Sequence, residues 1–236
     1  MKTDYLIVGS GLSALTFGAL MANSGKTVQI LEAHEHAGGF GHTFTMAKKY
    51  KFNAQFHYVW DCGEGQTVNR ILKKLGLERE VTFERYDPQG FDHMRSPEYA
   101  MDIPSEPEEL IQRLSSLFPE SSDRLRQFIN EVEITGEGLK KLSPPINPME
   151  LIKHPLEVFS TVQHLNSTLQ DVFDKFQLPQ GAQTLLALQW LDFLLPPNQL
   201  SFYAWVVLFR GYQAGAFYPT QHFEHVINSL VKVIES

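Results

Sequence analysis

Cysteine is almost absent from this chain of 236 residues, whose only one is Cys62. No disulfide can therefore form within the chain, and such sparse cysteine is typical of a reducing compartment. An excess of basic residues is also lacking, since the net charge is -7 and the isoelectric point lies near 5.7. This charge argues against nucleic acid, or an anionic membrane surface, as the main partner.

Long apolar runs are missing too. No stretch approaches the roughly 18 residues that a membrane-spanning helix requires. A signal peptide is not expected, because Asp4 and a glycine-rich turn come too early for one. We therefore expect a cytoplasmic protein. Hydrophobic residues make up 43% of the chain, which is enough for a core in one large or two small domains.

Several familiar catalytic motifs are also absent. The chain has no G-x-S-x-G nucleophile elbow, no Walker A lysine motif and no paired C-x-x-C. Two histidine pairs, His34 with His36 and His222 with His225, are close enough in sequence to share a metal. No cysteine or carboxylate set completes four ligands around either pair, so we predict no metal site.

What the sequence does contain is an ordered N-terminal pattern. Residues 5–8 form a short apolar run without alternation, which predicts a buried parallel strand. Residues 9–14 match G-x-G-x-x-A, and a helical pattern follows over residues 15–23. A second predicted strand, residues 27–31, ends on Glu32. This order of strand, glycines, helix, strand and acidic residue predicts a dinucleotide-binding fold.

Each part of this pattern has a physical role. Gly9 permits the tight turn, Gly11 lets the backbone approach a pyrophosphate, and Ala14 keeps the helix close to the strand. The positive end of the helix then attracts the phosphates. Glu32 stands where a carboxylate accepts a hydrogen bond from a ribose hydroxyl, which favours FAD or NAD over NADP.

Three further segments carry a family resemblance. Residues 37–44 read AGGFGHTF, residues 52–58 read FNAQFHY, and residues 215–219 read GAFYP. In this order they resemble motifs of the FAD-binding amine oxidase and phytoene desaturase superfamily, and most closely its branch of retinol saturases and carotenoid isomerases. The resemblance spans the chain, and it is most specific over the first forty-odd residues.

The resemblance implies FAD as the cofactor. It also implies an FAD-dependent oxidoreductase that acts on an isoprenoid polyene, by saturation, desaturation or cis–trans isomerisation. The residues expected to contact the AMP and pyrophosphate are Gly9, Gly11, Leu12, Ser13, Ala14 and Glu32. Those expected to run towards the ribityl chain and flavin ring are Gly38, Gly39, Gly41, His42 and Thr43.

Two side chains are candidate catalytic groups. His57 and Tyr58 lie in the second motif, where a side chain could donate a hydrogen bond to the cofactor or carry a proton. A histidine that only fixes a loop is an equally good interpretation of His57 and of His42.

The chain departs from the family pattern at a few positions. Asn53 and Gln55 stand where the family has aspartate and glycine, and Gln221 and His222 replace a glycine pair. Family enzymes are also much longer, so the missing C-terminal half, or a second chain, would complete the FAD domain. An alternative function is therefore a non-catalytic or split-enzyme FAD-binding subunit that needs a partner chain. A plain NAD dehydrogenase is disfavoured by the glycine pair Gly38-Gly39.

The expected fold class is α/β, a Rossmann-type FAD-binding fold of the glutathione-reductase-like kind. We expect a small antiparallel sheet to be inserted in it, and a largely helical substrate domain. Three β-like runs would build the inserted sheet, and a capping box S-x-x-E at residues 105–108 would open the helices that follow. The three runs are residues 81–86, 90–95 and 99–103. We expect residues 1–80 to form the FAD-binding region and residues 81–218 the substrate-binding region. Residues 219–236 are expected to form a helix that returns to the FAD domain.

The most regular helical pattern covers residues 158–176, with apolar side chains at i, i+3 and i+4 spacing. The most apolar segment is residues 185–218. Its aromatic side chains fit a buried core, and the family resemblance adds a tunnel for a hydrophobic polyene, with peripheral contact to a membrane as a further option.

Overall fold

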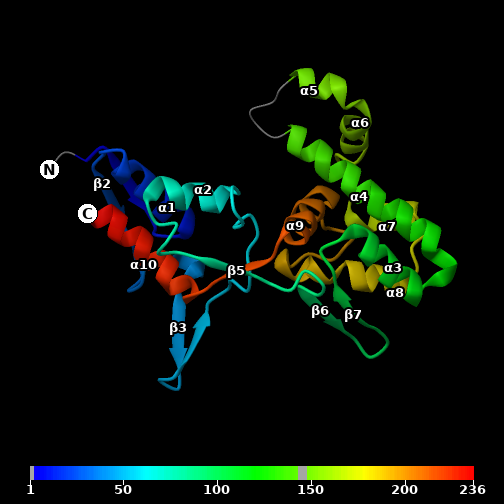
Figure 1. Ribbon diagram of the computed structural model, residues 1–236, viewed down its shortest axis with the longest axis horizontal. Coiled ribbons are helices and arrows are strands. Elements are labelled where there is room, and N and C mark those ends of the chain that lie inside the picture. The colour runs from blue at the N-terminus through cyan, green and yellow to red at the C-terminus, as the bar shows by residue number, and fades with distance from the viewer. Residues whose placement is uncertain (1–2, 143–147) are drawn as a thin grey trace. The chain divides into compact units, whose positions relative to one another are not determined.

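The computed structural model describes residues 3–142 and 148–236. The chain divides into two compact units, which are described separately (Figure 1). The first unit contains the residues up to Tyr86 together with Gly215–Ser236, and the second contains Asp87–Ala214.

The first unit is built on the predicted strand–helix–strand pattern. Strand β1 (Tyr5–Val8) pairs in parallel with β2 (Val28–Leu31), and helix α1 (Leu12–Asn23) connects them. Helices α2 (Thr67–Leu75) and α10 (His222–Glu235) pack on α1. The residues buried between these helices include Leu15, Ala19, Leu72, Leu75, Ile227 and Leu230.

Strand β1 forms where it is predicted, but the expectation that it is buried is wrong. Leu6 is 61% exposed and Val8 is 84% exposed, whereas Ile7 points towards Gly18 of α1. Parallel strands are normally covered on both faces. Here α1 covers one face of the two-stranded sheet, and within the described parts of the chain nothing covers the face that carries Leu6 and Val8.

The short antiparallel strands pair differently from the expected single sheet. Strand β5 (Phe83–Arg85) pairs with β8 (Phe217–Pro219) in the first unit, whereas β6 (Asp92–Arg95) pairs with β7 (Ala100–Ile103) in the second. The partner of β5 is more than 130 residues distant in sequence, so no local pattern could reveal it. The first unit also contains the turn η1 (Gly39–Gly41) and a hairpin of β3 (Thr43–Met46) and β4 (Tyr50–Asn53).

The second unit is mainly helical. Phe202, Trp205 and Phe209 are buried in it, which confirms the prediction of a buried core for these three side chains. The rings of Trp205 and Phe209 are stacked, with their centroids 4.6 Å apart. Among the residues described, no helix is both long and apolar enough to cross a membrane. The helices are α3 (Pro107–Leu117), η2 (Pro119–Ser121), α4 (Ser122–Leu142), α5 (Pro148–Lys153), α6 (Pro155–Gln163), α7 (Leu169–Lys175), α8 (Gln180–Leu186), η3 (Leu188–Asp192) and α9 (Phe202–Ala214).

Two local predictions in this unit are wrong. The periodic segment 158–176 is two helices, α6 and α7, because the chain leaves the helix after Gln163 and a capping box of Thr168 and Asp171 opens the next one. The expected capping box at residues 105–108 does not form. Helix α3 begins after Glu106 with Pro107 in its first turn, a position that proline favours because it has no N–H to satisfy there.

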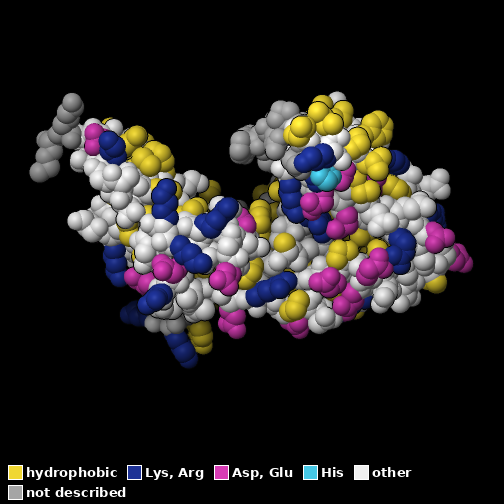
Figure 2. All heavy atoms as spheres, turned by 45° about the horizontal axis from the view of Figure 1, so that its top comes forward, with side chains coloured by type: hydrophobic (Ala, Val, Ile, Leu, Met, Phe, Trp, Pro, Cys, Tyr) yellow, Lys and Arg dark blue, Asp and Glu magenta, His cyan; other side chains and the backbone are white. Residues whose placement is uncertain are grey.

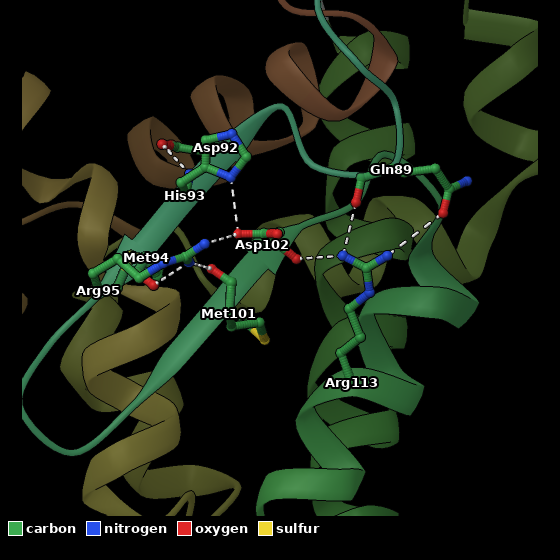
Figure 3. Close-up of polar contacts among 8 residues, drawn as sticks. All are labelled: Gln89, Asp92, His93, Met94, Arg95, Met101, Asp102 and Arg113. Carbon is green, nitrogen blue, oxygen red and sulfur yellow. Dashed lines mark hydrogen bonds and ion pairs between the residues drawn. The ribbon is translucent and has the colours of Figure 1, made fainter.

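Polar contacts fasten the β6–β7 hairpin to α3 (Figure 3). Asp102 accepts hydrogen bonds from His93 at 2.8 Å and from Arg95 at 2.7 Å, which holds the pKa of its carboxyl below the usual value. Arg113 of α3 donates to the carbonyl oxygens of Gln89 and Asp102, each at 2.7 Å. Asp102 is thus paired with His93 and Arg95, and Arg113 is held by backbone carbonyl oxygens, so we assign the cluster a structural role.

Candidate functional site

The first glycine loop leaves an open space at the start of α1. Gly9 has a φ of 91°, which favours glycine, whereas Gly11 has an ordinary φ of −61° and is the N-cap of the helix. A Cβ added to either glycine would meet nothing within 4 Å. Leu12, Ser13 and Ala14 form the first helical turn, which contains no acidic residue. The helix therefore presents its positive end to open space, and such an end attracts anionic groups.

The second glycine loop packs directly on the first. The N–H of Gly38 donates to the carbonyl oxygen of Ser10 at 2.9 Å, and Gly38 forms a parallel bridge with Gly11. Gly38 has a φ of 113°, and a Cβ there would lie 2.4 Å from Ile227. A Cβ on Gly39 would lie 3.1 Å from the Cα of Gly11. The two loops can approach this closely only because both are glycine-rich.

Glu32 is tied to the same junction. Its Oε2 accepts the backbone N–H and the hydroxyl of Ser10, and its Oε1 accepts the N–H of His34 at 2.8 Å. The Ser10 hydroxyl and then the His34 N–H are the main causes that lower the pKa of Glu32 to about 2. The carboxylate is exposed and stays charged at neutral pH. It can therefore accept from a ribose hydroxyl while it holds the loop.

The remaining predicted cofactor residues follow the second loop. Gly41 is buried, and Nδ1 of His42 lies 2.7 Å from the carbonyl oxygen of Gly39. Thr43 Oγ1 donates to Oδ1 of Asn53 at 3.3 Å and lies 3.2 Å from Nδ1 of His222. The structure thus brings residues of the first and second motifs together through hydrogen bonds.

The two candidate catalytic side chains lie beyond these loops. His57 is exposed, and the ring of Tyr58 lies 5.7 Å from that of Tyr86. Tyr86 and Tyr218 line a cavity of about 540 Å³. The Tyr218 hydroxyl accepts a hydrogen bond from Nδ2 of Asn53 at 2.7 Å. The sequence pattern located His57 and Tyr58 but gave no role to Tyr86, which directly follows strand β5.

His222 occupies a backbone conformation that favours glycine. Its φ is 73°, and the resembled family has a glycine pair at this point. The imidazole packs edge-on against Tyr218, with ring centroids 5.8 Å apart, and contacts Thr43. The backbone of His222 therefore takes a conformation typical of glycine, and its imidazole ring forms part of the wall of the 540 Å³ cavity. Asn53 and His222 were singled out in the sequence only as departures from a pattern, and their contacts needed the fold.

A second, apolar cavity of about 610 Å³ lies beside α1 and α2. Trp60, Phe83 and Phe223 contribute to its wall, and so does Cys62. Burial, with a smaller contribution from the charge of Asp61, raises the pKa of the Cys62 thiol to about 12. This thiol is therefore protonated at neutral pH and is a poor nucleophile.

The histidine pairs do not gather metal ligands. Within the described residues, no group of three histidine, cysteine or acidic side chains is placed to hold a metal ion. The rings of His34 and His36 lie 5.6 Å apart, and His225 lies 2.9 Å from the carbonyl oxygen of Glu80 through Nε2.

The geometry of these loops defines a class: a Rossmann-like dinucleotide-binding fold. Residues 7–75 match the family model of the NAD(P)-binding Rossmann-like domain. Over 99% of its length the chain is 26% identical to the all-trans-retinol 13,14-reductase of Homo sapiens, and it spans 40% of that protein. The chain is thus similar over almost its whole length to retinol 13,14-reductases, which confirms the resemblance carried by its motifs.

Two further similarities show less, the first because it is short and the second because its sequence identity is low. Over 83 residues, a third of the chain, it is 41% identical to the flavin-containing amine oxidase B of Sus scrofa, of which that match covers 14%. An oxidoreductase structure from Methanosarcina mazei has a TM-score of 0.59 at 16% identity, and the match covers 98% of this chain and 49% of that one. The identity in this second match is low, so it supports the fold alone.

Proposed function

We propose that this chain is the FAD-binding part of a flavin-dependent oxidoreductase that acts on an isoprenoid polyene. The observation that carries the proposal is the junction of the two glycine loops with Glu32. The open space at Gly9 and Gly11 suits a pyrophosphate, and the similarity of almost the whole chain to part of the retinol reductases supports a flavin rather than NAD as the dinucleotide. The glutathione-reductase-like variant of the fold belongs to the same proposal.

Different residues of the chain would bind different parts of FAD. Gly9, Gly11 and the first turn of α1 would hold the pyrophosphate, and Glu32 would accept from the adenosine ribose. The second loop would lead the ribityl chain towards the Tyr58–Tyr86 end of the unit. When bound, the flavin supplies hydride or electron chemistry that no side chain can supply.

The polyene and its reaction are proposed by analogy. The relatives are named for reduction of all-trans-retinol at positions 13 and 14, so we propose saturation of a polyene double bond as the reaction. Desaturation and isomerisation would use the same arrangement of flavin and polyene. Tyr58 and His57 are the proposed proton carriers or cofactor contacts at that end.

We further propose that another polypeptide segment completes the nucleotide domain. The chain spans about 40% of the length of the reductases that it matches, and the Leu6 and Val8 face of its small sheet is exposed. A parallel sheet of this size is rarely stable with one face bare. The segment could belong to the same protein or to a second chain.

The deciding experiment is the visible absorption spectrum of the purified chain and of its Gly11→Ala variant, after each has been incubated with FAD. The wild-type chain should bind FAD in near-stoichiometric amount. The added methyl meets no protein atom within 4 Å and the φ of −61° accepts alanine, so the variant should fold normally. It should nevertheless bind FAD roughly tenfold or more weakly, because the methyl stands where a phosphate would approach.

The matched control is Gly65→Ala. It adds the same methyl in open space in the same unit but away from both glycine loops, at the cost of some strain from its φ of 73°. FAD binding by the control should equal that of the wild-type chain. A wild-type chain that takes up no FAD, alone or with its completing segment, would exclude the flavoenzyme proposal.

A further inference from the structure

Two departures from the family pattern meet in one hydrogen-bond network. Asn53 and His222 stand where the resembled family has an aspartate and a glycine, far apart in the sequence. Both contact Thr43, whose Oγ1 lies 3.3 Å from Oδ1 of Asn53 and 3.2 Å from Nδ1 of His222. Asn53 also bonds to the hydroxyl of Tyr218 at 2.7 Å. Since Tyr218 and His222 line the cavity of about 540 Å³, both departures act on the wall of the same cavity.

The contacts of Asn53 fix the direction of its bond to Tyr218. The carbonyl oxygen of Phe56 can only accept, so Nδ2 of Asn53 is the atom that faces it, at 3.1 Å. The second hydrogen of Nδ2 is donated to the hydroxyl oxygen of Tyr218. The hydroxyl hydrogen of Tyr218 therefore points elsewhere, and within the described residues it has no acceptor in bonding range. It is free to bond to a ligand in the cavity.

An aspartate at position 53 would reverse this bond. A carboxylate can only accept, so it would take the hydroxyl hydrogen of Tyr218 for itself. Asparagine donates to the same oxygen and leaves that hydrogen free. The departure from the family pattern therefore turns Tyr218 into a hydrogen-bond donor for the cavity.

The Thr43 hydroxyl fixes the tautomer of His222 in the same way. Oδ1 of Asn53 can only accept, so the single hydroxyl hydrogen of Thr43 is donated to it. The contact between Thr43 and His222 then requires the hydrogen to be on Nδ1 of the imidazole. In the neutral ring Nε2 is left as an acceptor, and among the residues that the structure describes it has no partner.

The backbone of His222 is strained in order to place this ring. Its φ of 73° is adopted freely by glycine and at a cost by other residues. The imidazole stands edge-on to the ring of Tyr218, with the ring planes at 90° and the centroids 5.8 Å apart. One donor and one acceptor thus lie next to each other on the cavity wall.

We propose that this cavity binds the hydroxyl group of an isoprenoid alcohol, with Tyr218 as the hydrogen-bond donor and His222 as the acceptor. A hydroxyl group accepts and donates, so it satisfies both side chains, whereas a carbonyl group satisfies Tyr218 alone and a hydrocarbon end satisfies neither. Asn53 is a positioning residue, because it acts through Tyr218. This inference rests on the proposed function for the isoprenoid, but a glycine at position 222 would supply no acceptor, so the hydroxyl preference belongs to this chain.

The test is equilibrium binding of three probes, measured by quenching of the protein fluorescence. The probes are all-trans-retinol, all-trans-retinal and the hydrocarbon analogue that ends in a methyl group. The wild-type chain should bind retinol roughly fivefold more tightly than retinal, and retinal roughly fivefold more tightly than the hydrocarbon, because each step removes one hydrogen bond.

Two variants separate the donor from the acceptor. Tyr218→Phe should weaken binding of retinol and retinal roughly fivefold each and leave the hydrocarbon unchanged. His222→Gly restores the glycine of the family pattern in a conformation that suits it, and it should abolish the preference for retinol over retinal. The preference is a ratio, so a general change in cavity size does not imitate this result.

Asn53→Asp tests the positioning role. It should weaken retinal binding as much as Tyr218→Phe does, and it should have no further effect in the Tyr218→Phe background. The matched control is Thr220→Val, an isosteric loss of a hydroxyl from the same cavity wall. That hydroxyl is already bonded to Thr82 at 2.6 Å, so all three affinities should stay as in the wild-type chain. Circular dichroism checks that each variant folds.

The proposal is overturned if the wild-type chain binds the three probes equally or binds none of them. It is also overturned if Tyr218→Phe and His222→Gly leave the order of affinities unchanged. FAD uptake, measured on samples without a probe, separates this proposal from the proposed function. A chain that binds FAD without preferring the alcohol loses only the hydroxyl site. A chain that selects the alcohol through Tyr218 and His222 yet takes up no FAD keeps that site and loses the flavoenzyme proposal.

Discussion

At the residue scale, Ser10 joins the two halves of the dinucleotide motif. The glycines around it were predictable, because a tight turn and a close backbone approach restrict the choice of residue. Ser10 occupies a variable position of G-x-G-x-x-A, so the pattern assigns it no role. Its bonds to Glu32 exist only because the ends of β1 and β2 lie side by side. The hydrogen bond between Asn53 and Tyr218 could not be predicted either, because the fold brings these two residues together from distant parts of the sequence.

The Glu32 contacts predict a pH dependence of stability. The pKa of Glu32 is lowered from 4.5 to about 2, so its ionised form is favoured in the folded chain over the unfolded one. This contribution is present above the unfolded pKa near 4.5 and is lost as the pH falls through about 2. Glu32→Gln should therefore flatten the fall in the free energy of unfolding between these two pH values.

Urea unfolding of both proteins across that pH range measures this effect. Other carboxyl groups with lowered pKa values, such as Asp102 and Glu131, add the same background to both proteins. Only the difference between the two curves reports on Glu32. If the curves run parallel from neutral pH down to 2, the Ser10–Glu32 contact makes no contribution.

At the element scale, local patterns were sufficient where the element depends on its own sequence. The elements β1, α1, β2, α2 and α10 lie close to their predicted places, because glycine boundaries and apolar spacing are local signals. The pairing of β5 with β8 depends on chain segments far apart in sequence. Figure 2 shows hydrophobic side chains gathered over α5 and α6. In the predicted helical pattern of residues 158–176, the apolar side chains of Phe159, Val162 and Leu165 are exposed, so their spacing alone does not tell a core-facing side from a surface side.

Two glycines of α4 provide a matched pair of substitutions. A Cβ at Gly138 would lie 2.4 Å from the carbonyl oxygen of Glu157 as well as 2.1 Å from Thr161 Oγ1, so α4 and α6 would have to separate. Gly138→Ala should lower the free energy of unfolding by about 1–3 kcal/mol, as overpacking usually does.

Gly136 is its control. A Cβ there would lie 3.3 Å from the flexible side chain of Arg210, which can move aside. Gly136→Ala should be neutral, or should stabilise by up to about 1 kcal/mol through helix propensity. Thermal and urea unfolding compare the variants. Equal effects of the two substitutions would contradict the close α4–α6 contact.

At the scale of the whole molecule, the first unit contains two glycine loops on an incompletely covered sheet. The binary pattern of residues 5–8 specified a strand with two apolar faces, and it did so correctly. In the described parts of the chain nothing covers the second face. For that reason the fold class was predictable from the sequence, whereas the exposure of β1 was not.

The bare face predicts self-association of the isolated chain. Leu6 and Val8 expose an apolar surface beside an unpaired strand edge, a combination that favours contact with another chain.

The double variant Leu6→Lys, Val8→Lys should weaken self-association roughly tenfold or more, because it removes two apolar contacts and adds like charges. Sedimentation velocity over a concentration series measures the change. Gln29 is the ladder partner of Leu6 and lies on the same face, so Gln29→Lys adds a charge there without removing an apolar side chain and should weaken self-association less than the double variant does. If the completing segment is supplied, the double variant should fail to bind it and should lose FAD. An isolated wild-type chain that stays monomeric at every concentration would show that this face does not drive association.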